Sequence, residues 1–337
     1  MRDITVTLRV KDSLGNLTTK DVIIEEDTST PLVLGGYYKG SGADIYPDTV
    51  NREMNLRSHT TYRSFADANL FPGWNKQWIL NLMNAGVHMN YVLEWKFYGN
   101  TGTSALGVTP NSIMQQRPST TWPRFFGWNQ VLNGSCDILM DRAIGQLNTL
   151  PTPINIQFTS ERDTDNEFGI TENSTYISWS YADTLARQGI SYCINYFKDN
   201  GAPLGTTYTA GIGGFNKASF LRSYVPEVDF MQYNCYNHNG WRSPLQVFKR
   251  TYDWIDELPV AARQLDIIIA EWGCTYPSSA APTGATQGSW LRQVPTAVAQ
   301  LPKIKIANYF NSGWGTLTSE GLTGLIDCYN QHPFKAV

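Results

Sequence analysis

The feature that most constrains the fold is a repeated alternation of strand-like and helix-like segments. Eight segments rich in apolar and β-branched residues recur along the chain, separated by amphipathic stretches or loops. This order predicts an α/β protein of the (β/α)₈ TIM-barrel class, and a doubly wound sheet is the alternative. No Gly-x-Gly-x-x-Gly follows an early strand, which argues against a dinucleotide site. The expected strands are Leu32–Tyr38, Thr60–Phe65, Met89–Trp95, Pro153–Glu161, Thr206–Ala210, Val228–Tyr233, Asp266–Glu271 and Ile304–Phe310.

Between these strands the apolar spacing indicates helices. The expected helices are Trp74–Ala85, Asn133–Leu147, residues 177–199, Pro244–Leu258 and residues 288–300. A long loop over residues 98–128 is rich in Gly, Pro, Thr and Trp. Loops of that length in compact domains are usually functional.

Residues 1–30 differ from the rest of the chain. Apolar residues alternate with polar ones from Ile4 to Val10, turn residues follow, and Val22–Ile24 completes a second strand. The pair resembles the last hairpin of an immunoglobulin-like or PKD-type β-sandwich, so an upstream β-sandwich domain is expected in the full-length protein. We therefore divide the chain into residues 1–30, a hairpin with a polar linker, and residues 31–337, the barrel.

Composition excludes several classes of partner. The 337 residues carry 26 Lys+Arg and 29 Asp+Glu, a net charge of −3, which gives no support for a nucleic-acid or membrane-surface role. No run of about 18 apolar residues indicates a transmembrane helix. The start of the chain is not a signal peptide, so either the chain begins inside a longer protein or export uses another route. The expected location is extracellular, on a cell surface or on a virion.

Cysteine and histidine usage predicts neither a zinc site nor a disulfide framework. The five cysteines lack a Cys-x-x-Cys spacing, and their odd number cannot pair completely within the chain. The four histidines form no metal motif. We expect free, mostly buried thiols, no metal and no cofactor.

Two of the expected strands end on a glutamate. Three isoleucines precede Glu271, and an alternating segment precedes Glu161. Carboxyl ends of parallel barrel strands carry catalytic side chains, and glycoside hydrolysis needs two carboxyl groups, about 5–5.5 Å apart in retaining enzymes. The alternative for Glu271 is an ion pair with a neighbouring Arg or Lys. Tyr236, on the strand before Glu271, is positioned to donate an O–H to that carboxylate, or else is an ordinary barrel-rim aromatic.

Further candidates lie near the strand ends. Glu94 is a candidate for binding substrate hydroxyls, with a pair to Lys96 as the alternative, and Asp163 begins an acidic run that is either a solvated loop or a calcium-binding loop. The chain is rich in aromatic residues, with 11 Trp, 18 Tyr and 14 Phe, whose faces stack on sugar rings or fill the core. The aromatic candidates for sugar stacking are Trp95, Trp272, Phe310 and Trp314.

Several stretches resemble glycoside hydrolase family 26, the β-mannanase family of the clan A retaining barrels. They are Val131–Asp137 with Pro153–Glu161, Tyr224–Asn237 with its strand-terminal Tyr236, Glu271-Trp-Gly, Gly288–Leu291 and Leu301–Asn311. The resemblance implies that Glu161 is the general acid/base and Glu271 the nucleophile. The chain departs from the family pattern at Ser160, where the family has His, at Gln157, where it commonly has Arg, and at Asp163, where it has Asn. These departures bear on mannan specificity.

Two functions follow from these observations. The first is an endo-acting, retaining β-glycoside hydrolase that cleaves a polysaccharide, a β-mannan or related β-1,4/β-1,3 glycan. The second is a polysaccharide- or receptor-binding barrel with weakened catalysis, part of a surface or phage-tail protein.

Overall fold

A computed structural model describes most of the barrel and the N-terminal hairpin. The described residues are 2–11, 17–26, 33–38, 58–65, 75–97, 114–115, 124–126, 128–151, 153–159, 179–238, 240–275, 281–311 and 317–331. Strands β1, β2 and β3 are described by their backbone alone.

Eight parallel strands form a closed barrel, as the sequence predicts. Their order around the barrel follows the order of the chain, because each strand pairs with the next and the last pairs with the first. The strands are β3 (Val33–Tyr38), β4 (Ser58–Ser64), β5 (His88–Glu94), β9 (Ile154–Phe158), β10 (Thr207–Ala210), β11 (Phe230–Asn237), β12 (Asp266–Cys274) and β13 (Ile304–Asn311). The expected fold class is confirmed.

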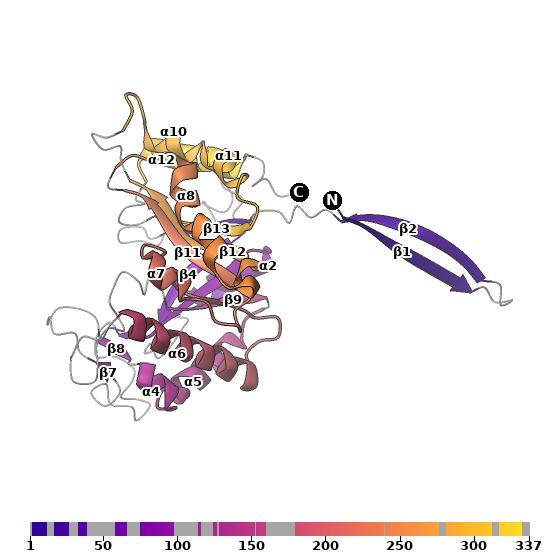
Figure 1. Cartoon of the computed structure of the whole chain (residues 1–337), viewed down its shortest axis with the longest axis vertical. Coiled ribbons are helices and arrows are strands. Elements are labelled where there is room, and N and C mark those ends of the chain that lie inside the picture. The colour runs from indigo at the N-terminus through magenta and orange to yellow at the C-terminus, as the bar shows by residue number, and fades with distance from the viewer. Residues whose placement is uncertain are drawn as a thin grey trace.

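Helices connect the strands and lie outside them, with α4–α6 and α10–α12 on opposite sides of the strands (Figure 1). The helices are α2 (Asn75–Asn84), α4 (Trp128–Leu132), α5 (Asp137–Leu147), α6 (Trp179–Asp199), α7 (Lys217–Leu221), α8 (Pro244–Tyr252), α9 (Val260–Arg263), α10 (Gln287–Leu291), α11 (Val294–Val298) and α12 (Ser319–Tyr329). Among the described helices, none combines the length and the apolar character needed to cross a membrane.

Several predicted boundaries are wrong for local reasons. The helix expected from Asn133 begins at Asp137, because Gly134 adopts a left-handed turn with φ of 82°. The single helix expected over residues 288–300 is two short helices, and Pro295 lies in the first turn of the second. The strand expected to end at Glu271 continues to Cys274.

Two small antiparallel sheets accompany the barrel. The predicted N-terminal hairpin is present as β1 (Arg2–Lys11) and β2 (Leu17–Glu26), paired along their full length. Just before and within the long loop, β6 (Lys96–Phe97), β7 (Met114–Gln115) and β8 (Arg124–Phe126) form a three-stranded sheet. The upstream β-sandwich and the boundary near residue 30 stay predictions.

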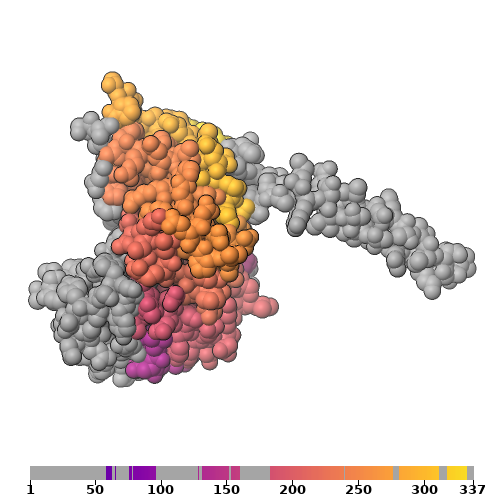
Figure 2. Space-filling model, in the orientation of Figure 1, coloured from indigo at the N-terminus to yellow at the C-terminus, as the bar shows by residue number. Residues whose placement is uncertain are grey.

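The outward faces of the strands and the inward faces of the helices form two apolar clusters. One lies around the first half of the barrel, from Phe65 to Val228, and the other around the second half, from Ile212 to Tyr329. Figure 2 shows the two halves of the chain on one face of the molecule, where the orange and yellow residues of the second half lie above the magenta and red residues of the first. All five cysteines are free and buried, as predicted.

The inward face of the barrel is polar for much of its length. Asn90 lies at the centre of a buried network, where its Nδ2 donates to Oε1 of Gln157 at 3.2 Å and to Oγ1 of Thr60 at 3.4 Å. Its Oδ1 accepts from Nδ2 of Asn155 at 2.5 Å. From β13, which only β3 separates from β4, Nδ2 of Asn308 donates to the same Thr60 Oγ1 at 2.6 Å. The interiors of such barrels are more often filled by Val, Ile and Leu. Here the interior side chains are joined by hydrogen bonds between strands, which are directional and favour one register of the strands.

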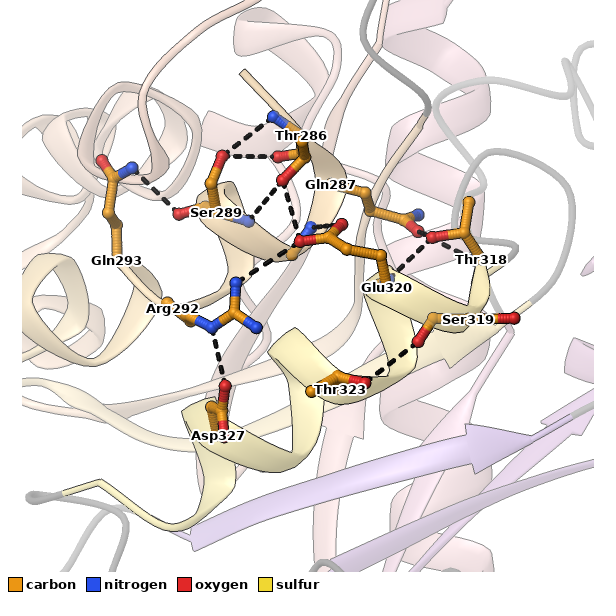
Figure 3. A network of polar contacts seen from close by, with 12 residues as sticks. Thr286, Gln287, Ser289, Arg292, Gln293, Thr318, Ser319, Glu320, Thr323 and Asp327 are labelled. Atoms are coloured by element: carbon orange, nitrogen blue, oxygen red, sulfur yellow. Dashed lines mark hydrogen bonds and ion pairs between the residues drawn. The ribbon is translucent and has the colours of Figure 1, made fainter. Parts of the chain in front are cut away.

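Helices α10 and α12 cross at a very close distance (Figure 3). A Cβ built on Gly324 would lie 2.3 Å from Cα of Gly288, so only glycine fits there. Polar bonds join the ends of the two helices: Oε2 of Glu320 accepts from the Gly288 N–H at 2.7 Å, and Oε1 of Gln287 accepts from the Thr318 N–H at 3.0 Å. Each helix therefore adds a hydrogen bond at the N-terminus of the other, beside the caps that Thr286 and Thr318 supply to their own helices.

Candidate active site

Glu271 faces the barrel interior because β12 contains a β-bulge. On the neighbouring β11, Tyr233 pairs with Ile269, whereas the next residue, Asn234, pairs with Glu271. Ala270 is therefore the extra residue of the bulge. In a regular strand the residue after an inward-facing Ala270 would point to the helices, but the bulge turns Glu271 inward as well.

Two tyrosines hold the Glu271 carboxylate, one at each oxygen. The Tyr236 hydroxyl donates to Oε2 at 2.6 Å, and the Tyr62 hydroxyl donates to Oε1. Tyr236 lies on β11, beside β12, whereas Tyr62 lies on β4, which β13 and β3 separate from β12. The Tyr62 bond therefore spans the end of the barrel. Glu271 is only 6% exposed, and its two oxygens are oriented by hydroxyl donors.

Phe310 packs against both tyrosines. Its ring centroid lies 6.1 Å from that of Tyr62 and 6.4 Å from that of Tyr236, and both contacts are edge-to-face. Phe310 is partly exposed at the end of β13. The ring that the sequence predicts as a sugar platform therefore also packs against the two tyrosines that donate to Glu271.

Glu94 closes β5 at the same end of the barrel and is 6% exposed. Burial raises the pKa of Tyr62 well above its usual value, and the negative charges of Glu271 and, more weakly, Glu94 add to that effect. The Tyr62 hydroxyl thus stays protonated and acts as a donor. The alternative pairing of Glu94 with Lys96 concerns a side chain outside the described residues.

Strand β9 ends in a constrained turn. Thr159 has φ of 66°, a conformation that a β-branched residue adopts only when its surroundings enforce it. The Gln157 side chain donates to the Thr159 carbonyl at 2.9 Å, and a Cβ on Gly211 would lie 1.8 Å from that carbonyl oxygen. Gly211 and Gln157 thus fix the point where the chain leaves β9. Glu161 follows two residues later in the sequence and, like Asp163, lies outside the described residues.

Two aromatic candidates prove to be core residues. Trp272 is 0% exposed and points outward, with its ring 4.8 Å from Tyr309 and 5.6 Å from Phe248 between centroids. Trp95 is 1% exposed and stacks on Phe65 at 3.9 Å. Both point away from the barrel interior, which corrects the expectation that they present a face to a sugar. Trp314 lies outside the described residues.

Tyr62 is the site residue that sequence reasoning missed. Its segment was expected as a strand, and the alternation of Ser58, Thr60 and Tyr62 places the three on one face. That alternation was the available signal, because an inward-facing tyrosine near a strand end of a barrel lies close to the catalytic end. No group of three or more His, Cys, Asp or Glu side chains that would suit a metal ion occurs among the described residues.

The described residues form a closed barrel of parallel strands with a carboxylate turned toward its interior at the carboxyl ends of the strands. No family model and no curated protein sequence matches the chain. Solved structures do match in fold. One is GH26C from Muricauda sp., with 13% identity, a TM-score of 0.61, and 91% of this chain and 87% of that chain covered.

Two further structures show the same likeness. A family 39 glycoside hydrolase from Bacteroides cellulosilyticus has 13% identity and a TM-score of 0.57, with 97% of this chain and 71% of that chain covered. A Bacillus subtilis mannanase has 12% identity and a TM-score of 0.57, with 88% of this chain and 85% of that chain covered. The fold is therefore that of the family 26 barrels, in agreement with the resemblance of the sequence.

Proposed function

We propose that the protein is an endo-acting, retaining β-glycoside hydrolase that cleaves a polysaccharide, a β-mannan or a related β-1,4/β-1,3 glycan, outside the cell or at a cell or virion surface. The observation that supports this most is Glu271: a carboxylate turned inward by a bulge, at the catalytic end of a barrel, with a donor at each oxygen. Hydroxyl donors favour the ionised form, which a nucleophile needs.

In the proposed reaction, an oxygen of Glu271 attacks the anomeric carbon while the bond from that carbon to the leaving oxygen breaks. Glu161 gives its proton to the leaving oxygen. In the second step water attacks the same carbon, gives its proton to Glu161, and releases Glu271 as a carboxylate. No cofactor takes part. Glu94, Asp163, Phe310 and Trp314 are the proposed substrate contacts.

The test is a product profile on a panel of mannans, glucans, xylans and bacterial surface glycans, read by mass spectrometry, with the first-formed anomer determined by NMR. We expect release of oligosaccharides with retained configuration. Glu271→Gln and Glu161→Gln should each lower kcat by roughly 10⁴-fold or more. Glu257→Gln, an exposed glutamate paired with Lys217 at 2.6 Å, is the matched control and should keep full activity.

A second candidate is a glycan- or receptor-binding barrel with weakened catalysis. It is favoured by Gln157, which stands where the family commonly has Arg. The Gln157 side chain accepts a hydrogen bond from Asn90 in the interior network and donates one to the Thr159 carbonyl. Binding to one glycan of the panel without any release of reducing ends would support this candidate and contradict hydrolysis.

A further inference from the structure

The two tyrosines that donate hydrogen bonds to Glu271 lie on opposite sides of the barrel end. Tyr236 is on β11, next to the strand of Glu271, whereas Tyr62 is on β4, which is not a neighbour of that strand. Building on the proposed function, we propose that Tyr62 is a positioning residue that, together with Tyr236, holds both oxygens of Glu271. In this role the pair orients the nucleophile for attack and stabilises it as the leaving group of the second step.

The packing of Phe310 supports a paired role for the tyrosines. Its ring makes the same kind of edge-to-face contact with each of them, at 6.1 Å to Tyr62 and 6.4 Å to Tyr236. One ring therefore packs against both of the tyrosines whose hydroxyls donate to Glu271. A tyrosine that only filled space would not need its hydroxyl at Oε1.

The surroundings of Tyr62 keep its hydroxyl a donor. The titratable groups that face it among the described residues are Glu271, Tyr236 and Glu94. Burial and these neighbours all raise the pKa of Tyr62, so it stays protonated wherever the enzyme works. The bond to Glu271 is then a charge-assisted one whenever the carboxylate is ionised.

The hydrogen bonds from Tyr62 and Tyr236 to Glu271 act differently in the two chemical steps. When Glu271 forms its ester with the sugar, one carboxylate oxygen becomes an ester oxygen and a weak acceptor, so one tyrosine bond weakens. When water attacks and the bond between Glu271 and the sugar breaks, the charge returns to the carboxylate and both bonds form again. Two donors therefore favour the second step, in which Glu271 departs.

The test is Tyr62→Phe, with Tyr233→Phe as the matched control. Tyr233 is fully buried, whereas Tyr62 is partly buried. The Tyr233→Phe variant loses one hydroxyl bond, to the Phe248 carbonyl at 2.7 Å, but Tyr233 faces outward. On the glycan that the wild type cleaves, Tyr62→Phe should lower kcat roughly 10- to 100-fold, as expected for a hydrogen bond to a charged group. KM should fall with kcat, because the glycosyl-enzyme accumulates, and the acidic limb of the pH profile should move to higher pH. The control should leave kcat and KM within about 2-fold.

A measurement that does not depend on activity separates this inference from the proposed function. Isotope-edited NMR of the glutamate side-chain carboxyl carbons identifies Glu271 as the resonance that Glu271→Gln lacks. In Tyr62→Phe its titration should move to higher pH. An unchanged titration, or a variant with wild-type kcat, KM and pH profile, would overturn the role of Tyr62 while leaving the nucleophile assignment intact. Full activity in Glu271→Gln would instead overturn the proposed function.

Discussion

The inside of the barrel and the layer outside it are built from different chemistry. Outside, the two clusters between strands and helices are apolar and aromatic. Inside, hydrogen-bonded amides and hydroxyls such as Asn90, Thr60 and Asn308 form much of the packing. Apolar burial is non-directional and supplies most of the stability, whereas buried hydrogen bonds supply direction. A site that must orient one carboxylate is therefore built on the polar side.

Two consecutive residues show the difference. Glu271 points into the barrel and receives two hydroxyl bonds, and Trp272 points outward into three aromatic neighbours. Both residues are on β12, so their different roles follow from the bulge at Ala270 and from the side chains that surround each of them.

The largest effect on stability is expected from Trp272→Ala. Removing a fully buried indole leaves a cavity in the outer layer, so the free energy of unfolding should fall by about 3–5 kcal/mol, measured by urea denaturation. Glu271→Gln should change it by about 1 kcal/mol or less, because the amide fits the same space. Equal losses in the two variants would contradict the division of roles.

Next is Asn90→Leu, which keeps the volume but removes the centre of the interior network. The Asn155 amide and the Gln157 carbonyl lose their partner, which should cost about 2–4 kcal/mol in unfolding free energy. Met89→Leu is the matched control, since Met89 lies next to Asn90 on β5 but faces outward. It should cost less than about 1.5 kcal/mol. An unchanged free energy of unfolding in Asn90→Leu would show that the barrel interior tolerates an apolar side chain at this position.

A smaller effect is expected where α10 and α12 cross. Gly324→Ala places a methyl group against Cα of Gly288, and the overpacking should cost about 1–3 kcal/mol. Gly145→Ala on α5 is the control, because no atom lies within 4 Å of its added Cβ. It should be neutral or stabilising by up to about 1 kcal/mol. Thermal unfolding of both variants measures the difference.

The smallest effect is expected from Glu320→Gln and depends on pH. Partial burial raises the pKa of Glu320, but bonds from the Gly288 N–H and the Thr286 hydroxyl, with the charge of Arg292, outweigh it and lower the pKa below its usual 4.5. The carboxylate therefore contributes stability above pH 4.5, and this is lost as the pH falls through the lowered pKa. At pH 7 the free energy of unfolding of the wild type should exceed that of the variant by about 1 kcal/mol, which is the size of effect measured for helix caps.

Unfolding curves from pH 3 to pH 7 measure this contribution. The difference between wild type and Glu320→Gln should vanish at the acid end. Glu257→Gln should show a difference of about 0.5 kcal/mol or less throughout, since both partners of its ion pair are exposed. A gap for Glu320→Gln that persists at low pH would contradict the capping role.

Periodicity was enough to predict the strands and their order. The three isoleucines before Ala270 read as a buried strand, and Ile154–Phe158 as an alternating one, and both form barrel strands. Boundaries were predicted less well where local turns intervene, as at Gly134. Within the site, Glu271 and Tyr236 were predicted, but Trp95 and Trp272 were misplaced. A residue next to a strand-terminal glutamate looks the same in sequence whether it faces substrate or core.

The sequence by itself determined the alternation of strands and helices, and with it the barrel and the end at which Glu271 stands, because periodic burial acts over a few residues at a time. The tertiary structure alone decided that Glu271 turns inward, since the bulge is a property of the pairing of β12 with β11. It also decided that Tyr62, 209 residues away in the chain, meets Glu271. That contact depends on closing the barrel, which brings together strands that are not neighbours.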